Sequence, residues 1–140
     1  MTVSELMRTD VVTAGPDAAA SDLAREMRDE RVGSVVIVEG GRPTGIVTDR
    51  DLAVGVVAES ADPERATARE LMTAEPTTVP DDLGVFDLCD EFASARVRRL
   101  PVVADDGTLA GIVTLDDLHV MLVDEQSDLS RAVQASIPPY

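Results

Sequence analysis

The feature that most constrains this chain is that its two halves repeat each other. Residues 41–57 (GRPTGIVTDRDLAVGVV) match residues 107–123 (GTLAGIVTLDDLHVMLV), with an offset of 66 between the equivalent glycines Gly45 and Gly111. Upstream of these segments the offset is 65, and the following pairs correspond: Met7 and Met72, Thr13 and Thr78, Leu23 and Leu88, Met27 and Phe92, Val32 and Val97. A duplicated unit decides the architecture before any local pattern does. The chain is therefore expected to fold as two homologous units, with one inserted residue in the second.

Each unit predicts the same order of elements. A short strand segment (residues 11–13 or 77–79) is followed by Pro-Asp, which favours a turn and a helix start. Apolar residues at three-to-four-residue spacing then predict a buried helix face. Two β-branched runs separated by a glycine-containing turn predict a hairpin, and a second helix begins at Asp49 or Leu115. The expected fold class is α/β (α+β), with two β-α-β-β-α units packed sheet to sheet around a pseudo-twofold axis.

The boundaries between these units follow from the intervening segments. The first domain is expected over residues 1–60, a linker helix over 61–73 and the second domain over 74–124. The linker assignment rests on residues 63–72, which begin with proline and have a helix-forming composition. Residues 125–140 are expected to form a terminal helix and tail, because Leu129, Val133 and Ile137 recur every four residues. A loosely packed terminal helix is the default, and a helix that covers a neighbouring subunit is the alternative.

Composition excludes several classes of function. The chain carries 27 acidic residues, 12 arginines and no lysine, for a net charge of −15. Nucleic-acid backbones and anionic membranes would repel this surface. No stretch approaches the roughly 18 apolar residues that a membrane span requires, and no signal peptide is evident, so a cytoplasmic protein is expected. The acidic excess favours a salt-adapted source, with a GC-rich genome as the alternative explanation for the arginines.

The sequence offers few residues that could support catalysis or bind a metal. The single Cys89 lies within a helical pattern and is expected to be a small buried hydrophobe without a disulfide. The single His119 has no second histidine or cysteine near it, so no metal site is expected and a partly exposed helix residue is favoured. The sequence contains no nucleophile–base pair and no G-x-x-x-x-G-K loop. We therefore expect no enzyme activity and no catalytic residues.

The repeated string Gly-Ile-Val-Thr-x-x-Asp, at residues 45–51 and 111–117, resembles the signature of cystathionine β-synthase-type (CBS) domains. The resemblance extends from about residue 7 to residue 123, because both copies follow the expected helix and hairpin at matching distances. In that family two such domains in one chain form a Bateman module, and two modules commonly associate into a disc-like homodimer. The resemblance therefore implies a stand-alone tandem CBS pair that associates with itself.

The Thr and Asp of the repeated string allow two roles at once. A Thr followed three residues later by an acidic residue is typical of a capped helix start, in which the hydroxyl accepts a hydrogen bond from a backbone N–H. The family resemblance adds that this Asp often binds ribose hydroxyls, while the Thr favours a phosphate. Capping and ligand contact are compatible roles for Thr48 and Asp51, and equally for Thr114 and Asp117.

By resemblance, each of two clefts combines the Thr and Asp of one repeat with the hairpin start and N-terminal segment of the other. The first cleft is expected to contain Thr48, Arg50, Asp51, Pro76, Thr77, Val97, Arg98 and Arg99. The second is expected to contain Thr9 to Val11, Val32, Gly33, Ser34, Thr114 and Asp117. Guanidinium groups match phosphate oxygens, so the first cleft is the stronger candidate. The alternative for Arg98 and Arg99 is surface pairing with surplus carboxylates. The second cleft lacks a basic residue at its hairpin start, and residues 116 and 117 add negative charge.

The leading functional hypothesis is a regulatory binding module. An adenosine-containing ligand (AMP, ADP, ATP, S-adenosylmethionine or NAD, with Mg²⁺ only beside a polyphosphate) would act as an energy signal by shifting how this chain fits a second copy or an unknown effector protein. The alternative is a dimeric interaction or scaffold protein whose clefts are vestigial. In the first repeat, residues 33–36 (Gly-Ser-Val-Val) replace the Arg-Arg-Leu-Pro of the second, which weakens the prediction of a nucleotide in the second cleft.

Overall fold

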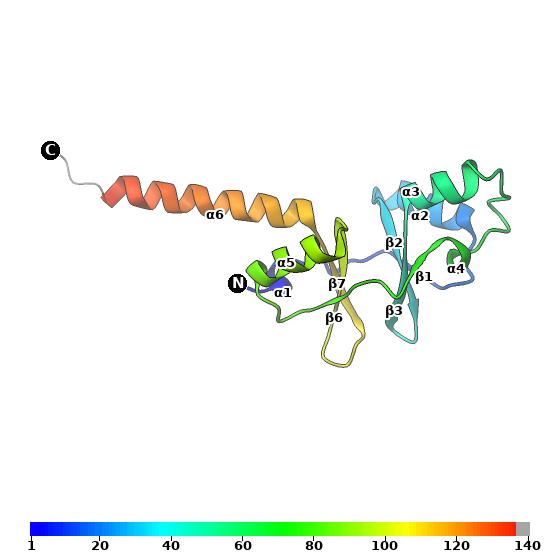
Figure 1. Ribbon diagram of the computed structural model, residues 1–140, viewed down its shortest axis with the longest axis horizontal. Helices are drawn as coiled ribbons and strands as arrows, with labels where there is room; N and C mark the ends of the chain where they lie inside the picture. The colour runs from blue at the N-terminus through cyan, green and yellow to red at the C-terminus, as the bar shows by residue number, and fades with distance from the viewer. Residues whose placement is uncertain (137–140) are drawn as a thin grey trace.

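The computed structural model describes residues 1–136, which form two similar α+β halves joined by two crossing segments (Figure 1). The first half contains β1 (Thr13–Ala14), α2 (Ala20–Glu30), β2 (Ser34–Glu39), β3 (Arg42–Thr48), α3 (Asp49–Leu52) and the π-helix η1 (Ala53–Val57). The second half contains β5 (Val79–Pro80), α5 (Val85–Ala95), β6 (Arg99–Val103), β7 (Leu109–Thr114) and α6 (Leu115–Ser136). The remaining elements are α1 (Val3–Leu6), α4 (Ala68–Leu71) and β4 (Thr73–Ala74).

The two sheets repeat each other strand by strand, as the duplication predicts. One sheet has the order β1-β2-β3-β4 and the other β5-β6-β7. In each, a short parallel strand precedes an antiparallel hairpin, and the register is preserved: Ile37 pairs with Gly45, and Val102 pairs with Gly111. Each hairpin has its irregularity immediately after that pair. The hairpin tips meet where the Leu109 amide donates to the Gly41 carbonyl at 2.8 Å.

The helices that precede the hairpins also end in the same way. Helices α2 and α5 each have 11 residues. Each is followed by an arginine in the left-handed conformation, Arg31 and Arg96, both with φ of 56°. The cap N–H then bonds to the carbonyl of Met27 or Phe92, the residue four positions earlier. These matched ends place Val32 and Val97 at equivalent starts of the two hairpins.

Two segments cross between the halves and change the boundaries expected from the sequence. Helix α1 lies against the second half, where Thr2 bridges Gly84 and Arg8 bridges Ile112. Helix α4 and strand β4 instead pair with the first half, through Thr67–Ala19 and through the register of β3 with β4. Residues 1–8, which were expected in the first domain, pair with strands and loops of the second half. The linker helix expected over residues 61–73 is confined to Ala68–Leu71, because Pro63 and its neighbours form a turn.

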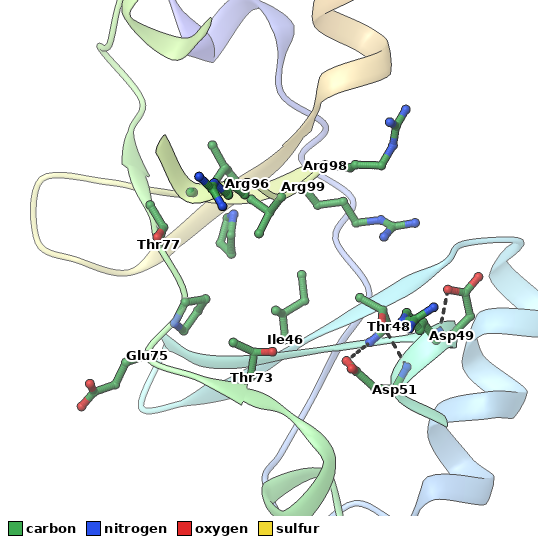
Figure 2. Close-up of a pocket in the computed structure, with 16 residues that line it drawn as sticks. Ile46, Thr48, Asp49, Asp51, Thr73, Glu75, Thr77, Arg96, Arg98 and Arg99 are labelled. Carbon is green, nitrogen blue, oxygen red and sulfur yellow. Dashed lines mark hydrogen bonds between the residues drawn. The ribbon is translucent and has the colours of Figure 1, made fainter. Parts of the chain in front are cut away.

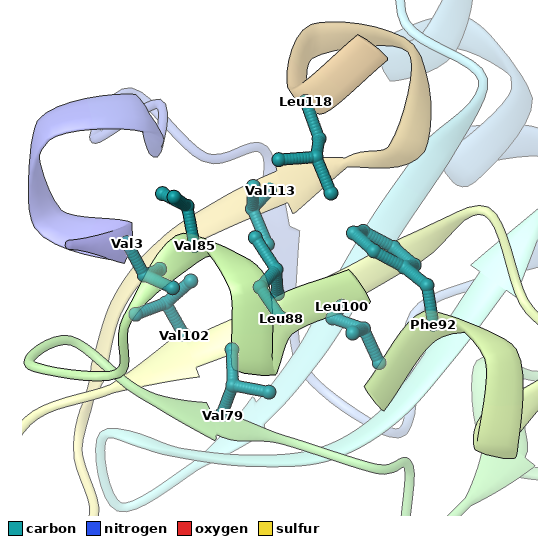
Figure 3. Close-up of a cluster of buried hydrophobic side chains, with 9 residues drawn as sticks. All are labelled: Val3, Val79, Val85, Leu88, Phe92, Leu100, Val102, Val113 and Leu118. Atoms are coloured by element: carbon teal, nitrogen blue, oxygen red, sulfur yellow. The ribbon is translucent and has the colours of Figure 1, made fainter. Parts of the chain in front are cut away.

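Each half has its own apolar core, and the crossing segments contribute to both. The second core includes Val3 from α1, fully buried beside residues of α5 and the second sheet (Figure 3). Its buried members are Val3, Val79, Val85, Leu88, Phe92, Leu100, Val102, Val113 and Leu118. The first core contains Ala68 from α4, together with Leu23, Met27, Val35, Ile37 and Val47. Burial of this apolar surface therefore stabilises the crossing as well as each half.

The C-terminal helix has no break near residue 124, where the second domain was expected to end. Helix α6 runs without interruption from Leu115 to Ser136, since no glycine or proline interrupts those 22 residues. Figure 1 shows its later turns extending away from both sheets. Ile137 and the final residues, on which part of the tail prediction rested, lie outside the described residues. No helix among the described residues is long and apolar enough to span a membrane.

Candidate functional site

A cavity lies where strand β3, the segment after β4 and the start of β6 approach one another. Its volume is about 500 Å³. In Figure 2, Thr48 and Asp51 project from the β3–α3 junction of the first half, while Arg96, Arg98 and Arg99 come from the second. Ligand pockets of several hundred Å³ are large enough to enclose most of a small molecule. Both halves of the chain therefore contribute side chains to one ligand-sized cavity.

Thr48 and Asp51 form a reciprocal cap at the start of α3. The Asp51 amide donates to Thr48 Oγ1 at 3.2 Å, and the Thr48 amide donates to Asp51 Oδ2 at 2.8 Å. This is the capping role that the repeated string predicts. The other carboxylate oxygen, Asp51 Oδ1, makes no hydrogen bond with the residues that the structure describes. The cap holds the carboxyl group in place and leaves one of its oxygens available to a hydroxyl donor.

The two adjacent arginines of the hairpin start point in different directions. Arg98 forms an exposed ion pair with Asp116, at 2.5 Å between Nη2 and Oδ1. This is the surface pairing that was the alternative for this residue, and exposed pairs contribute little stability. Arg99 instead reaches across to the first half: a Cβ placed on Gly33 would lie 2.6 Å from its Nη2 atom. The absence of a side chain at Gly33 makes room for this guanidinium.

The charge of the cavity contrasts with that of the whole chain. Its lining includes four arginines (Arg50, Arg96, Arg98 and Arg99) and three acidic residues (Asp49, Asp51 and Glu75). The chain as a whole has 12 arginines against 27 acidic residues. The cavity is therefore much less acidic than the chain as a whole, and its guanidinium groups offer paired donors to phosphate or carboxylate oxygens of a ligand.

The structure brings together all the residues predicted for the first cleft. Thr48, Arg50, Asp51, Pro76, Thr77, Val97, Arg98 and Arg99 all line the cavity. Sequence reasoning missed Ile46, Asp49, Thr73, Glu75, Ala95, Arg96, Leu100 and Pro101. Two of these residues could have been predicted. Ile46 lies on the same face of its strand as Thr48, because side chains alternate along a strand, and Thr73 pairs with Ile46 across β3 and β4. That these residues bind a ligand remains a prediction.

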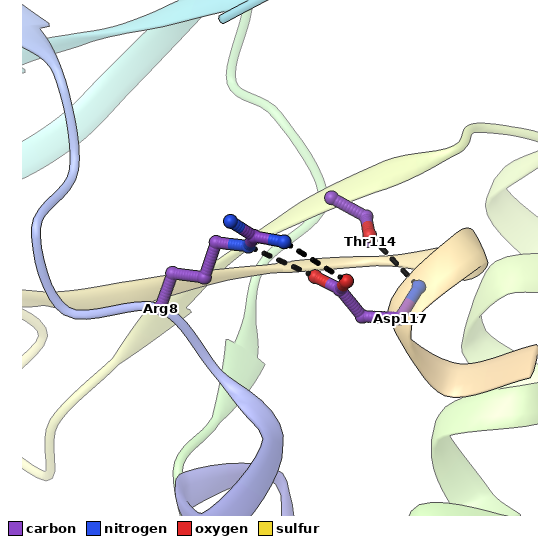
Figure 4. A network of polar contacts seen from close by, with 3 residues as sticks. All are labelled: Arg8, Thr114 and Asp117. Atoms are coloured by element: carbon purple, nitrogen blue, oxygen red, sulfur yellow. Dashed lines mark hydrogen bonds and ion pairs between the residues drawn. The ribbon is translucent and has the colours of Figure 1, made fainter. Parts of the chain in front are cut away.

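The second predicted cleft is arranged differently, because Arg8 lies against its aspartate (Figure 4). Arg8 Nε donates to Asp117 Oδ2 and Nη2 donates to Oδ1, both at 3.1 Å. The Asp117 amide donates to Thr114 Oγ1 at 3.1 Å, so Thr114 caps α6 as expected. The hydrogen bonds from Arg8 hold the pKa of the Asp117 carboxyl below its usual range, although partial burial opposes the shift. Both oxygens of this carboxylate are therefore occupied by one guanidinium.

The negative charge expected from residues 116 and 117 of the second cleft is partly balanced in this structure. Asp116 pairs with Arg98 and Asp117 pairs with Arg8, so both carboxylates have cationic partners from other segments. A hollow of about 440 Å³ borders Arg8 and Asp117 but runs along α6 as far as Glu125. Its lining contains none of the other residues predicted for that cleft: Thr9 to Val11, Val32, Gly33, Ser34 and Thr114.

Cys89 and His119 lie outside the main cavity. Cys89 is partly buried, packs against the second core and donates a weak hydrogen bond to the Val85 carbonyl at 3.5 Å. His119 is an exposed residue of α6. Among residues 1–136, no cluster of three or more His, Cys, Asp or Glu side chains has the arrangement of a metal site.

Comparison with known proteins matches two segments of the chain, residues 3–57 and 68–133, to the CBS domain. An uncharacterized protein of Methanopyrus kandleri is 40% identical over 119 residues, which cover 84% of this chain and 61% of that protein. The CBS domain-containing protein YhcV of Bacillus subtilis is 33% identical over 125 residues, covering 89% of this chain and 88% of the relative. The chain thus spans less than two thirds of the first relative and most of the second.

A solved structure provides a comparison in three dimensions. The CBS domain protein PAE2072 of Pyrobaculum aerophilum, complexed with AMP, superposes with a TM-score of 0.76 at 27% sequence identity. The similarity covers 84% of this chain and 89% of that protein. The two-sheet α+β fold and the tandem arrangement expected from the repeat are thereby confirmed.

Proposed function

Because the chain belongs to the CBS domain family as a tandem pair, we propose that it is a regulatory module that binds an adenosine-containing nucleotide between its halves. The observation that carries this proposal is the composition of the cavity beside β3. A capped carboxylate from one half and arginines from the other line the same cavity, whose volume is about 500 Å³. The AMP complex of the Pyrobaculum aerophilum relative supports the choice of ligand class.

The cavity offers a separate partner for each part of such a ligand. Asp51 Oδ1 would accept hydrogen bonds from ribose hydroxyls, since Oδ2 already accepts from the Thr48 amide. Arg99 and Arg96 would neutralise phosphate, whereas Arg98 would first have to leave Asp116. The apolar atoms of Ile46, Val97 and Pro101 would contact the base. Mg²⁺ would accompany the ligand only if it carries a polyphosphate.

The regulatory step follows from the position of the cavity between the halves. A ligand held by Asp51 on one side and by Arg99 on the other would favour the arrangement in which those groups are correctly spaced. A ligand shifts an equilibrium only by its differential affinity for two states. The nucleotide would thus change how the module fits a second copy of itself, or a separate effector protein. Sedimentation velocity with and without AMP would measure the first of these effects.

The test is thermal stabilisation by AMP, ADP, ATP, S-adenosylmethionine and NAD, measured on the wild type and on Asp51→Asn. Asparagine keeps an oxygen for the Thr48 amide but replaces the second carboxylate oxygen with an NH₂ group, which cannot accept from a ribose hydroxyl. A ligand at 100 times its Kd stabilises the folded state by about 2.7 kcal/mol. This corresponds to a rise in Tm of about 9 °C for a chain of this size.

The matched control is Asp62→Asn, which removes the same charge from an exposed loop, where Asp62 caps the Glu64 amide. We expect one compound to raise the Tm of the wild type and of the control, and to have a much smaller effect on Asp51→Asn. Failure of all five compounds to stabilise the wild type would contradict the proposal. That result would favour the interaction-protein alternative, in which the clefts are vestigial.

A further inference from the structure

We infer that Arg8 is an internal competitor for the second cleft, so that the module has one strong nucleotide site per chain instead of two. This inference rests on the proposed function, because it concerns the same class of ligand. It starts from a difference between two aspartates that the duplication makes equivalent. Among the residues that the structure describes, Asp51 keeps one oxygen without a protein partner, whereas both oxygens of Asp117 accept hydrogen bonds from Arg8.

The position of Arg8 follows from the crossing of α1 into the second half. Arg8 bridges Ile112 in the same way that Thr73 pairs with Ile46. Thr73 lines the first cavity with a short neutral side chain. The equivalent position in the second cleft holds a long cation instead, and that cation lies within hydrogen-bonding distance of the carboxylate expected to bind ribose.

The geometry of the pair makes Arg8 an effective competitor. Its contact with Asp117 is bidentate, with two parallel N–H···O bonds of 3.1 Å, which is the stronger form of an arginine–carboxylate interaction. The Asp117 side chain is only 26% exposed, although that of Arg8 is 65% exposed. A ribose would have to displace the guanidinium before its hydroxyls could reach either oxygen of the carboxylate.

Replacing Arg8 by threonine, the residue at the equivalent position 73, should therefore open the second site. We would measure AMP affinity by isothermal titration calorimetry in an Asp51→Asn background, which weakens the first site. Arg8→Thr is compared there with Arg25→Thr, which removes an arginine of similar exposure (55% against 65%) paired with Asp22 on α2, outside the residues that line the cavity. The two variants have the same net charge, so a general electrostatic effect on an anionic ligand cancels.

We expect Arg8→Thr to tighten AMP binding by about tenfold relative to Arg25→Thr, the order expected for one hydrogen bond to a charged group. Adding Asp117→Asn should remove the gain. Equal affinity of the two variants, no binding by either, or a gain that survives Asp117→Asn would each overturn the inference. Circular dichroism and Tm verify that each variant is folded.

The same titrations separate this inference from the proposed function. If the wild type does not bind AMP but the Arg8→Thr variant binds it through Asp117, the first site is refuted and the competitor role is supported. A wild type that binds one AMP per chain, while the Asp51→Asn/Arg8→Thr variant binds none, would support the first site and refute the competitor role. If the wild type already binds two AMP per chain with equal affinity, Arg8 is not a competitor.

Discussion

The glycine of the repeated string provides the sharpest test of the crossed architecture. Gly45 and Gly111 are equivalent positions, and each lies under a segment that crosses from the other half. A Cβ added at Gly111 would lie 2.7 Å from the carbonyl oxygen of Arg8 and 2.8 Å from Met7 Sδ. At Gly45 the same addition would clash with Met72 Sδ and lie 2.8 Å from Met72 Cγ, and its three nearest neighbours are all side-chain atoms of Met72. The obstacle at Gly111 therefore includes backbone, whereas the obstacle at Gly45 is a flexible side chain.

The difference in obstacle sets the expected magnitudes. Overpacking a filled site costs about 1–3 kcal/mol. At Gly111 the displaced carbonyl also accepts a hydrogen bond from the Ile112 amide at 2.9 Å, which adds about 1 kcal/mol if that bond is lost. We expect Gly111→Ala to lower the free energy of unfolding by about 2.5 kcal/mol, or Tm by about 8 °C. Gly45→Ala should cost about 1 kcal/mol, because the Met72 side chain can change rotamer.

Urea unfolding followed by circular dichroism would measure these differences, with Gly15→Ala as the control. A Cβ on Gly15 meets no atom of residues 1–136 within 4 Å, and this residue does not have a left-handed φ. Alanine there should leave stability unchanged or raise it by about 0.5 kcal/mol, because it restricts the unfolded chain. If Gly111→Ala were as stable as Gly15→Ala, residues 7 and 8 would not cross over Gly111, and the placement of α1 in the second half would be wrong.

Three further outcomes follow from the buried contacts and the caps. Leu88→Ala should lower the free energy of unfolding by about 2–5 kcal/mol, because this side chain is fully buried; a loss below 1 kcal/mol in urea titration would argue against that packing. Thr48→Ala should cost about 1 kcal/mol through loss of the cap to the Asp51 amide, whereas Thr48→Ser should retain it; equal losses in thermal melts would show that the hydroxyl is not the cap. Because Arg8 lowers the folded-state pKa of Asp117, this pair stabilises the fold above the unfolded pKa of about 3.9 and ceases to do so as pH falls through the folded-state pKa. The stability difference between wild type and Arg8→Thr should therefore be at most about 1 kcal/mol at pH 6 and should shrink as the pH falls below about 3.9, and a difference that stays constant over this range in urea titrations would contradict the ion pair.

The hairpins and the first cavity could be predicted because their signals are local or repeated. The β-branched runs mark the strands, and the glycine turns fix where the strands reverse. The Thr48–Asp51 cap requires only a spacing of three residues, so the sequence alone predicts it. The cavity followed from the family resemblance, which placed the arginines of the second hairpin start opposite Asp51. That placement agrees with the residues that line the cavity.

The crossing segments could not be predicted in the same way, because a short helix carries no local sign of the half against which it packs. The segments Glu5-Leu6-Met7 and Glu70-Leu71-Met72 repeat each other, which shows that they are equivalent. Equivalence does not say which sheet each one joins. The pairing of Arg8 with Asp117 has the same origin: the chain has 27 acidic residues, and only the fold selects one of them.

The crossing also bears on the proposed function, in which one site would report on the whole module. Asp51 is positioned by β3, whose edge is completed by residues 73 and 74, and these residues continue directly into the cavity wall at Glu75 and Pro76. The opposite wall begins at Ala95, the last residue of α5, which packs on the core that contains α1. A ligand that bridges the two walls therefore touches elements fixed in different cores. Movement of one half against the other would change the distance between Asp51 and Arg99, and with it the affinity for the ligand, so binding and the arrangement of the halves must be coupled.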